Sequence, residues 1–149
     1  MTENVQKRLI AELEQKFISC EGIVNIPPPV FRMMKGNVIS YDVERGTMII
    51  SYPVSLEYMN PFGSMQGGMI AAAIDNTLGP LSMLVAPLNY TRSLEIKFRK
   101  IIRHDSSVIT VFAQFINQNK RQLNFTASVV DTESFELASA KATHWIIEK

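Results

Sequence analysis

Cysteine is nearly absent from this chain. Cys20 is the only one among 149 residues, so no disulfide can form within the chain. A protein without internal disulfides suits the reducing cytoplasm, where we expect this one to reside. Residues 1–18 are charged throughout and contain no apolar segment of the kind found in secretory signals. Asp75 and Gly79-Pro80 interrupt the longest apolar run, so we expect no membrane span of the required ~20 residues.

The net charge is also small. The chain has 15 Lys and Arg against 14 Asp and Glu, a formal net charge of +1, which gives no reason to expect nucleic acid as a partner. It lacks a P-loop, a dinucleotide-binding fingerprint and a Gly-x-Ser-x-Gly elbow, which argues against nucleotide hydrolysis and serine-esterase chemistry. The two histidines, His104 and His144, lie far apart in sequence with no cysteine or carboxylate at ligand spacing, so we expect no metal site.

The composition is that of an ordinary globular domain. Apolar residues make up 46% of the chain and charged residues 19%. A chain of about 150 residues can bury roughly 70% of its unfolded surface in one core. We therefore expect a single domain over residues 1–149, in which residues 1–30 form an N-terminal helix and a proline-rich linker.

The N-terminal segment has the spacing of an amphipathic helix. Its apolar positions are Val5, Leu9, Ile10, Leu13, Phe17 and Ile18. We expect this helix to begin at Thr2, to end near Cys20-Glu21-Gly22, and to dock its apolar face onto the rest of the domain. Pro27-Pro28-Pro29 then predicts an extended linker.

Most of the remaining chain shows the alternation typical of β-strands. We expect strands over residues 37–43, 47–54, 91–102, 108–116, 123–129 and 135–147. Gly46 is suited to a positive φ in the first hairpin turn, and Pro53 indicates an edge strand or a bulge. With a helix over residues 67–85, the order is helix, two strands, central helix, then four strands joined by hairpins. This order predicts one sheet that wraps around the central helix and buries it on most sides, with a second copy of the chain covering the remainder.

Residues 60–75 are the most informative stretch. Turn residues open it, and Gly67-Gly68 then leads into a helix that is apolar on almost every side, so we expect it to be buried on every side. Asp75 lies within that helix, and burying an unpaired carboxylate costs several kcal/mol. Asp75 could cap a neighbouring turn ahead of Gly79-Pro80, or it could take part in catalysis.

The glycine pair suggests an oxyanion site. Glycines at a helix start leave the first free N–H groups unshielded at the positive end of the helix dipole, where a carbonyl oxygen gaining negative charge would be stabilised. Gly68 and Asp75 are seven residues apart and fall on nearly the same stripe, about 10 Å apart along the axis. Because that distance is too long for both to act on one carbon, we expect a homodimer in which a second, antiparallel copy supplies the missing group.

These residues resemble the signature of hotdog-fold thioesterases, in the 4-hydroxybenzoyl-CoA and phenylacetate-degradation thioesterase group. The recurring pattern in that group is an Asn, then a loop, then a His-Gly-Gly at the helix start, and an Asp eight residues beyond the first glycine. Asn60, Gly67, Gly68 and Asp75 match this pattern, whereas Gln66 stands at the histidine position. Glutamine cannot become charged, so any role of Gln66 would be positional.

The resemblance implies both a fold and a set of roles. The fold would be α+β, an antiparallel sheet of about six strands around one long helix, with an extra N-terminal helix, assembled as a homodimer or a homotetramer. Gly67 N–H would polarise the thioester carbonyl, and Asn60 would help to hold the site. Asp75 of the opposite subunit would activate water or attack directly. Thr91, or more weakly Ser93, would orient that water.

Other side chains have two interpretations. Lys97 and Arg99 share one strand face with Arg103, near Arg92 and Lys100. This face is either simply solvated or, as the resemblance implies, binds the phosphates of coenzyme A; Gly68 and Ser93 complete the candidate substrate contacts. Three methionines are attributed to core packing rather than to an acyl tunnel: Met65, Met69 and Met83.

The sequence therefore leaves two hypotheses for the function, one an enzyme and the other a binding protein. The first is an acyl-CoA thioesterase that needs no cofactor, because coenzyme A enters as part of the substrate. The alternative is a hotdog dimer that binds an acyl-CoA or fatty acyl ligand without turning it over, which Gln66 favours. A hydratase ranks third, because it would want an Asp and His pair and no histidine lies near this motif in the sequence.

Overall fold

The computed structural model describes residues 2–20 and 25–148. The helices are α1 (Thr2–Lys16), α2 (Pro29–Met33), the short 3-10 helix η1 (Leu56–Tyr58) and α3 (Gly67–Val85). The strands are β1 (Asn37–Asp42), β2 (Thr47–Pro53), β3 (Asn89–Phe98), β4 (Val108–Asn119), β5 (Gln122–Val130) and β6 (Glu136–Ile146).

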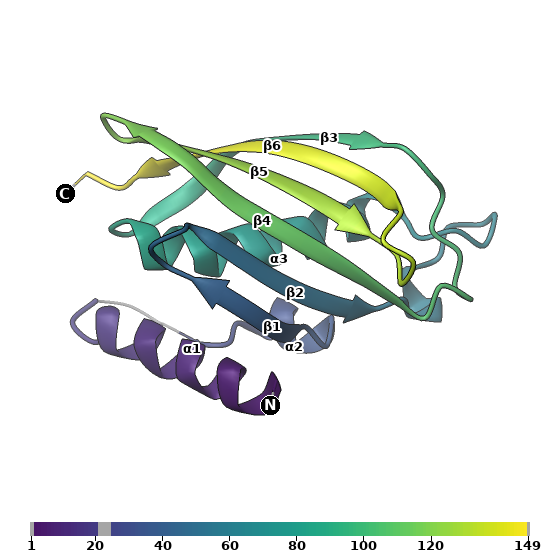
Figure 1. Cartoon of the computed structure of the whole chain (residues 1–149), viewed down its shortest axis with the longest axis horizontal. Helices are drawn as coiled ribbons and strands as arrows, with labels where there is room; N and C mark the ends of the chain where they lie inside the picture. The colour runs from purple at the N-terminus through teal and green to yellow at the C-terminus, as the bar shows by residue number, and fades with distance from the viewer. Residues whose placement is uncertain (1, 21–24, 149) are drawn as a thin grey trace.

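The six strands form one antiparallel sheet in the order β1-β2-β4-β5-β6-β3. The sheet curves around α3, and α1 lies beside β1 at the far edge (Figure 1). This confirms the expected α+β fold. Hairpins join β4, β5 and β6 as predicted, but the expected hairpin between β3 and β4 is wrong. β3 pairs with β6 at one edge, and residues 99–107 carry the chain across to β4, which pairs with β2.

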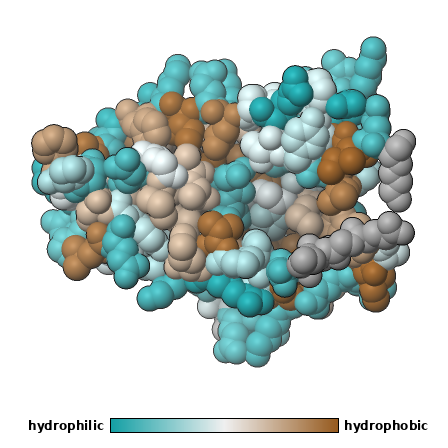
Figure 2. All heavy atoms as spheres, turned by 180° about the vertical axis from the view of Figure 1, so that it is seen from behind, coloured by the Kyte–Doolittle hydropathy of each residue, from teal (hydrophilic) through white to brown (hydrophobic). Residues whose placement is uncertain are grey.

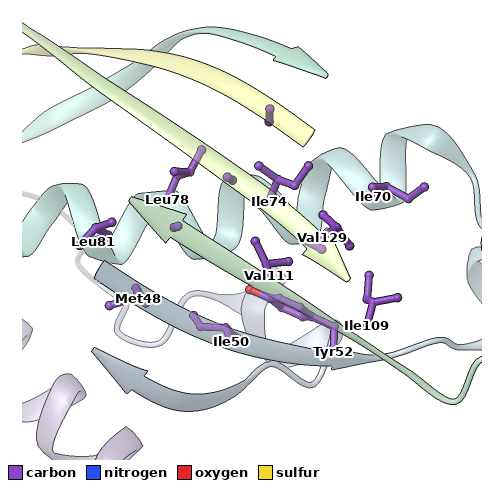
Figure 3. Packing of buried hydrophobic residues seen from close by; sticks show 14 of the residues in the cluster. Met48, Ile50, Tyr52, Ile70, Ile74, Leu78, Leu81, Ile109, Val111 and Val129 are labelled. Atoms are coloured by element: carbon purple, nitrogen blue, oxygen red, sulfur yellow. The ribbon is translucent and has the colours of Figure 1, made fainter. Parts of the chain in front are cut away.

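The core lies between α3 and the sheet. Figure 3 shows α3 side chains pointing at side chains of β2, β4 and β5. The labelled residues are Ile70, Ile74, Leu78 and Leu81 from α3, and Met48, Ile50, Tyr52, Ile109, Val111 and Val129 from the sheet. All are buried, and a fully buried aliphatic side chain of this size contributes roughly 1.5–3 kcal/mol. This packing fixes α3, and therefore Asp75, relative to the strands.

One buried polar pair joins the two layers. The hydroxyls of Tyr52 on β2 and Thr77 on α3 are 2.9 Å apart, and Thr77 Oγ1 donates to Ala73 O at 2.9 Å. Burial raises the pKa of Tyr52, with the Thr77 hydrogen bond opposing the change. Because each hydroxyl has a partner, the core holds this pair without an unsatisfied polar atom.

Within the single chain the helix α3 is not buried on every side, and the expected cover by a second copy stays a prediction. Gly68 and Asp75 are exposed, and Ala71, Ala72 and Met83 are only half-buried. The view from behind the sheet shows apolar and pale side chains across much of the middle of this face, interrupted by hydrophilic ones (Figure 2). The sheet covers one side of α3 and leaves the other open.

The helix α3 also bears on the expected absence of a membrane span, which stays a prediction. α3 is long enough and apolar enough to cross a membrane by length and composition. In this fold, however, its most apolar positions face the sheet, so it is the central helix of the domain.

The helix α1 docks onto the domain as expected, through Leu9, Leu13 and Phe17, which are buried. It ends earlier than predicted, at Lys16, and Ile18 is 75% exposed rather than packed; Glu21 and Gly22 lie outside the described residues. The expected helix end is wrong because Phe17, Ser19 and Cys20 already belong to a turn that includes a Cys20 N–H to Phe17 O hydrogen bond.

Lys16 links α1 to the end of α3. Its ammonium donates to the carbonyl oxygens of Met83, Leu84 and Ala86. Lysine at a helix C-terminus satisfies the last carbonyls and interacts favourably with the dipole. Burial lowers the pKa of Lys16. This contact holds α1 against the same helix that carries Asp75.

Of three local predictions, the one at Gly46 is confirmed and the two at prolines are wrong. Gly46 has φ +64°, as predicted. The extended linker is wrong at Pro29, which begins α2 because proline suits the first helical position. Pro53 marks neither an edge nor a bulge: it is the last residue of β2, a strand paired on both sides, where a missing N–H matters least.

Two strand ends also differ. β3 stops at Phe98, because Arg99 N–H and Lys100 N–H both donate to the same Leu137 carbonyl and the ladder breaks there. β4 continues to Asn119 rather than residue 116, and the hairpin turn is correspondingly later, with Lys120 at φ 56°.

Candidate active site

Asn60 organises the loop that leads into α3. Its Oδ1 accepts hydrogen bonds from the backbone N–H groups of Phe62 and Ser64 at 2.9 and 3.2 Å, and its Nδ2 donates to Ser64 Oγ at 2.8 Å. Asparagine commonly stabilises turns in this way. The contacts of Asn60 therefore position the start of α3; a contact with substrate stays a prediction.

The start of α3 carries two free backbone donors. The Gln66 carbonyl accepts the N–H groups of Met69 and Ile70 at 2.9 and 3.2 Å, while its exposed side chain makes no capping hydrogen bond. Among the described residues, no acceptor receives a hydrogen bond from Gly67 N–H or Gly68 N–H. Two such donors at the positive end of a helix can stabilise an oxyanion.

The two glycines differ in their surroundings. A Cβ at Gly67 would lie 3.4 Å from the Phe98 ring, whereas a Cβ at Gly68 would meet nothing within 4 Å. A side chain at 67 would make ordinary van der Waals contact and one at 68 would make none, so packing within the chain requires glycine at neither position. Glycine at 68 suits the close approach of a group from outside this chain.

Asp75 lies on the open face of α3 and is exposed within the single chain. Its Oδ1 accepts a hydrogen bond from the Thr91 hydroxyl on β3 at 2.8 Å. This contact gives the carboxylate a fixed orientation while leaving it accessible, which a general base or a nucleophile needs.

Thr91 rather than Ser93 meets Asp75, because a bulge lies between them. Thr91 pairs with His144, but the register shifts and Ser93 pairs with Thr143. Regular alternation would place residues 91 and 93 on one face of the sheet; the extra residue instead turns Ser93 away, where its hydroxyl lies 2.7 Å from Thr143 Oγ1. Of the two predicted hydroxyls, only Thr91 contacts the carboxylate.

His144 lies behind Thr91 and extends the polar contacts of the site into the core. Its Nε2 lies 3.4 Å from Thr91 Oγ1, and its Nδ1 lies 2.8 Å from Asn89 Oδ1. The ring is 1% exposed and packs against Phe125, with ring centroids 4.9 Å apart. Asp75, Thr91, His144 and Asn89 therefore form one continuous polar cluster from the open face of α3 into the core.

The Asn89 amide determines which histidine nitrogen carries the proton. Its Nδ2 donates to the carbonyls of Ser82 and Pro87 at 3.2 and 2.9 Å, so its Oδ1 faces His144 as an acceptor. Nδ1 of His144 must then be the donor, and in the neutral ring Nε2 presents a lone pair to Thr91. The Thr91 hydroxyl has one proton, and the shorter contact assigns it to Asp75.

The pKa of His144 is lowered by burial, and the nearby Asp75 carboxylate opposes this in part. On acidification the unfolded chain therefore takes up a proton at His144 before the folded chain does. The contribution of neutral His144 to the free energy of unfolding is fully present above the pKa of the unfolded chain, about 6.5, and is lost as the pH falls through the pKa of the folded chain. Below about pH 6.5 we therefore expect the free energy of unfolding to fall less steeply with decreasing pH in His144→Gln than in wild type. One proton can change this slope by at most about 1.4 kcal/mol per pH unit.

Urea unfolding between pH 5 and pH 8 measures this dependence. His104→Gln is the matched control, since His104 is exposed in a loop. If wild type and His144→Gln lost stability in parallel on acidification, the assignment to His144 would be wrong.

Sequence reasoning did not assign a role to His144. One signal was present: residues 138, 140 and 142 are all alanine, and the same alternation places His144 on their buried face. A histidine at the end of a row of small buried residues is unusual, because histidine is less often fully buried than alanine. Its contact with Thr91, however, depends on strand register and a bulge.

The basic residues do not form one strand face. Lys97 is the only member of the Lys97, Arg99, Lys100 and Arg103 group inside β3, and Arg103 pairs with Ser64 in a separate bridge. Arg99 donates to Glu136 at 2.7 Å and to Ser139 at 2.9 Å. Lys100 lies over the Phe135 ring, 4.8 Å from its centroid. Arg99 is therefore already paired, which weakens it as a phosphate ligand.

One chain does not bring the two halves of the candidate site together. Gly67 and Asp75 are eight residues apart on α3, about 12 Å along the axis. The free donors with Asn60 and Gln66 lie at one end, and the cluster of Asp75 and Thr91 lies further along.

No protein-family model matches the sequence, and no curated protein matches it. Solved structures do. The E. coli PaaI protein from the phenylacetic acid degradation operon has a TM-score of 0.76 at 15% identity and covers 94% of this chain and 96% of its own. The chain has the hotdog fold.

Two further hotdog structures extend the comparison. A thioesterase-like, phenylacetic acid degradation-related protein from Ralstonia eutropha JMP134 has a TM-score of 0.75 at 21% identity, covering 89% of this chain and 98% of its own. The smu.793 protein of Streptococcus mutans, bound to acetyl CoA, has a TM-score of 0.69 at 18% identity, covering 75% and 88%. These similarities extend over most of each chain, so the hotdog fold accounts for most of the present protein.

Proposed function

We propose that this protein is an acyl-CoA thioesterase. The observation that carries the proposal is the accessible Asp75 carboxylate, oriented by Thr91, on the same open face of α3 as the free N–H groups of Gly67 and Gly68. An anion-stabilising donor pair and an oriented carboxylate are the two elements that thioester hydrolysis needs. Structures of similar fold are described as phenylacetic acid degradation proteins, and one holds acetyl CoA.

The two elements act together if two copies share each site. An antiparallel copy placed on the open face of α3 would bring its Gly67 N–H toward Asp75 of the first copy. β3, which carries Thr91, is an edge strand of ten residues next to that face, and an unpaired edge can pair with another chain. We therefore propose a homodimer with two equivalent sites, which could pair again into a homotetramer.

The chemistry then has two forms. In the first, Asp75 takes a proton from water, the resulting hydroxide attacks the thioester carbon, and the carbonyl oxygen becomes an oxyanion held by Gly67 N–H of the partner subunit. The C–S bond breaks, and the coenzyme A thiolate leaves and takes up the proton. In the second, Asp75 itself attacks the thioester carbon, the C–S bond breaks and the coenzyme A thiolate leaves. Water then hydrolyses the acyl-enzyme anhydride, which releases the acid, regenerates the Asp75 carboxylate and supplies the proton taken up by the thiolate. Thr91 orients Asp75 in both forms.

Coenzyme A would contact the protein as part of the substrate, and we propose no cofactor. Lys97 and Lys100 form no ion pair among the described residues, so they are better placed than Arg99 to bind its phosphates. The free thiol of Cys20 fits the reducing cytoplasm that we propose as the compartment.

A specific observation favours the second candidate, a hotdog dimer that binds acyl-CoA without hydrolysis. Gln66 occupies the position of the histidine in the resembling thioesterases, and its exposed side chain neither caps α3 nor can become charged. If the chemistry needed that histidine, the site would bind thioesters and leave them intact.

Two measurements on short, long and aromatic acyl-CoAs separate the two functions. One is thiol release, and the other is calorimetric binding of the same compounds. The thioesterase hypothesis predicts turnover of at least one class well above the rate of spontaneous hydrolysis. Binding without turnover would support the second candidate instead. If the protein neither binds nor hydrolyses any of these acyl-CoAs, both hypotheses are contradicted.

A further inference from the structure

A cavity of about 310 Å³ opens beside Asp75, between α3 and the N-terminal part of the chain. Most of its lining is apolar: Leu13 of α1, Ile26, Pro28, Phe31 of α2, and Pro80 and Met83 of α3. Its polar lining residues are Asn25, Asp75 and Asn76. The cavity therefore joins an apolar chamber to the candidate catalytic carboxylate.

The order of residues on α3 gives the cavity a direction. The helix contributes Asp75 and Asn76 at one end of the wall and Met83 at the other, about 12 Å further along the axis. Asp75 is exposed, whereas Leu13 and Phe31 are buried. A group that enters at Asp75 would pass from a polar mouth to an apolar interior.

The cavity continues beneath α1. A second apolar space of about 40 Å³ shares Leu13, Ile26, Pro28, Phe31 and Pro80 with the first. An apolar cavity of about 150 Å³ accommodates benzene, so the larger space has room for one aromatic ring and several further carbon atoms. It is also within the usual range for small-molecule pockets, roughly 300–1,000 Å³.

We propose that this cavity binds the acyl group of the substrate and that Met83 limits its length. The inference rests on the proposed function and deepens it: the substrate carries an apolar acyl group larger than acetyl. The lining contains no Lys or Arg among the described residues, so the phosphates of coenzyme A have no counter-charge there and must lie on the other side of the thioester.

Met83 is suited to setting the limit. It is half-buried at the end of the cavity remote from Asp75, and methionine adapts its shape to irregular space. Lys16 donates to the Met83 carbonyl and holds α1 against this end of α3, so the wall opposite Met83 is fixed. The N-terminal helix thus becomes part of the specificity site rather than a peripheral addition.

The test replaces Met83 in both directions, with Met83→Ala and Met83→Trp, in the full chain. Acyl-CoAs from acetyl to dodecanoyl, and phenylacetyl-CoA, are assayed by thiol release and by calorimetric binding. Ile18→Ala is the matched control, because Ile18 is 75% exposed and does not line the cavity. Thermal melts of each variant establish that it is folded.

We expect Met83→Ala to move the preferred chain length upward and Met83→Trp to reduce kcat/KM for the longest substrates at least tenfold, with acetyl-CoA little changed. If wild type hydrolyses thioesters but all variants share its length profile, the cavity proposal is wrong and the thioesterase proposal stands.

If neither wild type nor any variant hydrolyses a thioester, the binding affinities test the cavity proposal. Affinities whose chain-length preference shifts with Met83 would support the cavity while overturning the proposed activity. Affinities that do not depend on chain length or on Met83 would overturn the cavity proposal as well.

Discussion

Replacing Asp75 with Asn is expected to reduce kcat for thioester hydrolysis by about 10²–10⁴-fold, the range for loss of a positioned general base. Asn keeps the shape of the side chain and can still accept the hydrogen bond that Thr91 donates to Asp75 at 2.8 Å. It cannot take a proton from water or attack a carbonyl carbon. Since Asp75 is exposed within the chain and Asn can keep the Thr91 hydrogen bond, the melting temperature should stay close to that of wild type.

Asp105→Asn is the matched control for this variant, because Asp105 is an exposed acid in the loop between β3 and β4. Thiol release from the best acyl-CoA, with melting curves and mass measurement of the assembly, makes the comparison. An Asp75→Asn protein that is folded, assembled and as active as Asp105→Asn would remove Asp75 from the mechanism.

Replacing Gly67 with Pro is expected to reduce kcat by about 10²–10³-fold, the range for removing one oxyanion donor. Proline deletes the Gly67 N–H, which donates to no acceptor in the described chain, so no hydrogen bond of the fold is lost. Position 67 is the first residue of α3, where proline is favoured. The preceding Gln66 has φ −57° and ψ 133°, the extended conformation that a residue before proline requires.

Gly67→Ala separates the loss of the donor from the added bulk. It places a Cβ at the same 3.4 Å distance from the Phe98 ring but keeps the N–H. We therefore expect Gly67→Ala to be markedly more active than Gly67→Pro in the thiol-release assay. Equal activities would mean that the backbone donor at 67 has no part in the reaction.

The elements near the site could largely be predicted from local patterns. The apolar run and the glycine pair predict α3 to begin at Gly67 and reach Val85, as it does. Gly46 at the first hairpin has the positive φ that a turn glycine permits. Such features depend on neighbours in sequence, so periodicity and turn residues suffice to indicate them.

The features that complete the site are non-local and could not be predicted in this way. The meeting of Thr91 with Asp75 requires β3 to lie at the sheet edge next to the open face of α3, and a bulge decides that Thr91 rather than Ser93 contacts Asp75. The burial of His144 beside Thr91 follows from the register between β3 and β6.

The exposure of Asp75 within one chain has a different cause. Its apolar neighbours suggested a helix enclosed on every side, but one curved sheet covers only part of the circumference of α3. An apolar composition indicates how much of a helix can be buried, but it does not indicate whether the cover comes from the same chain.

The central claim is that each site takes Asp75 from one subunit and Gly67 from the other. Mixing Asp75→Asn with Gly67→Pro under denaturing conditions and refolding them together tests it most directly. If sites are shared, half of the dimers are mixed and one of their two sites is intact, so about a quarter of the wild-type activity should return. If activity stays at the mean of the two parent variants while mixed dimers form, the two groups do not cooperate across an interface, and the shared-site account is contradicted.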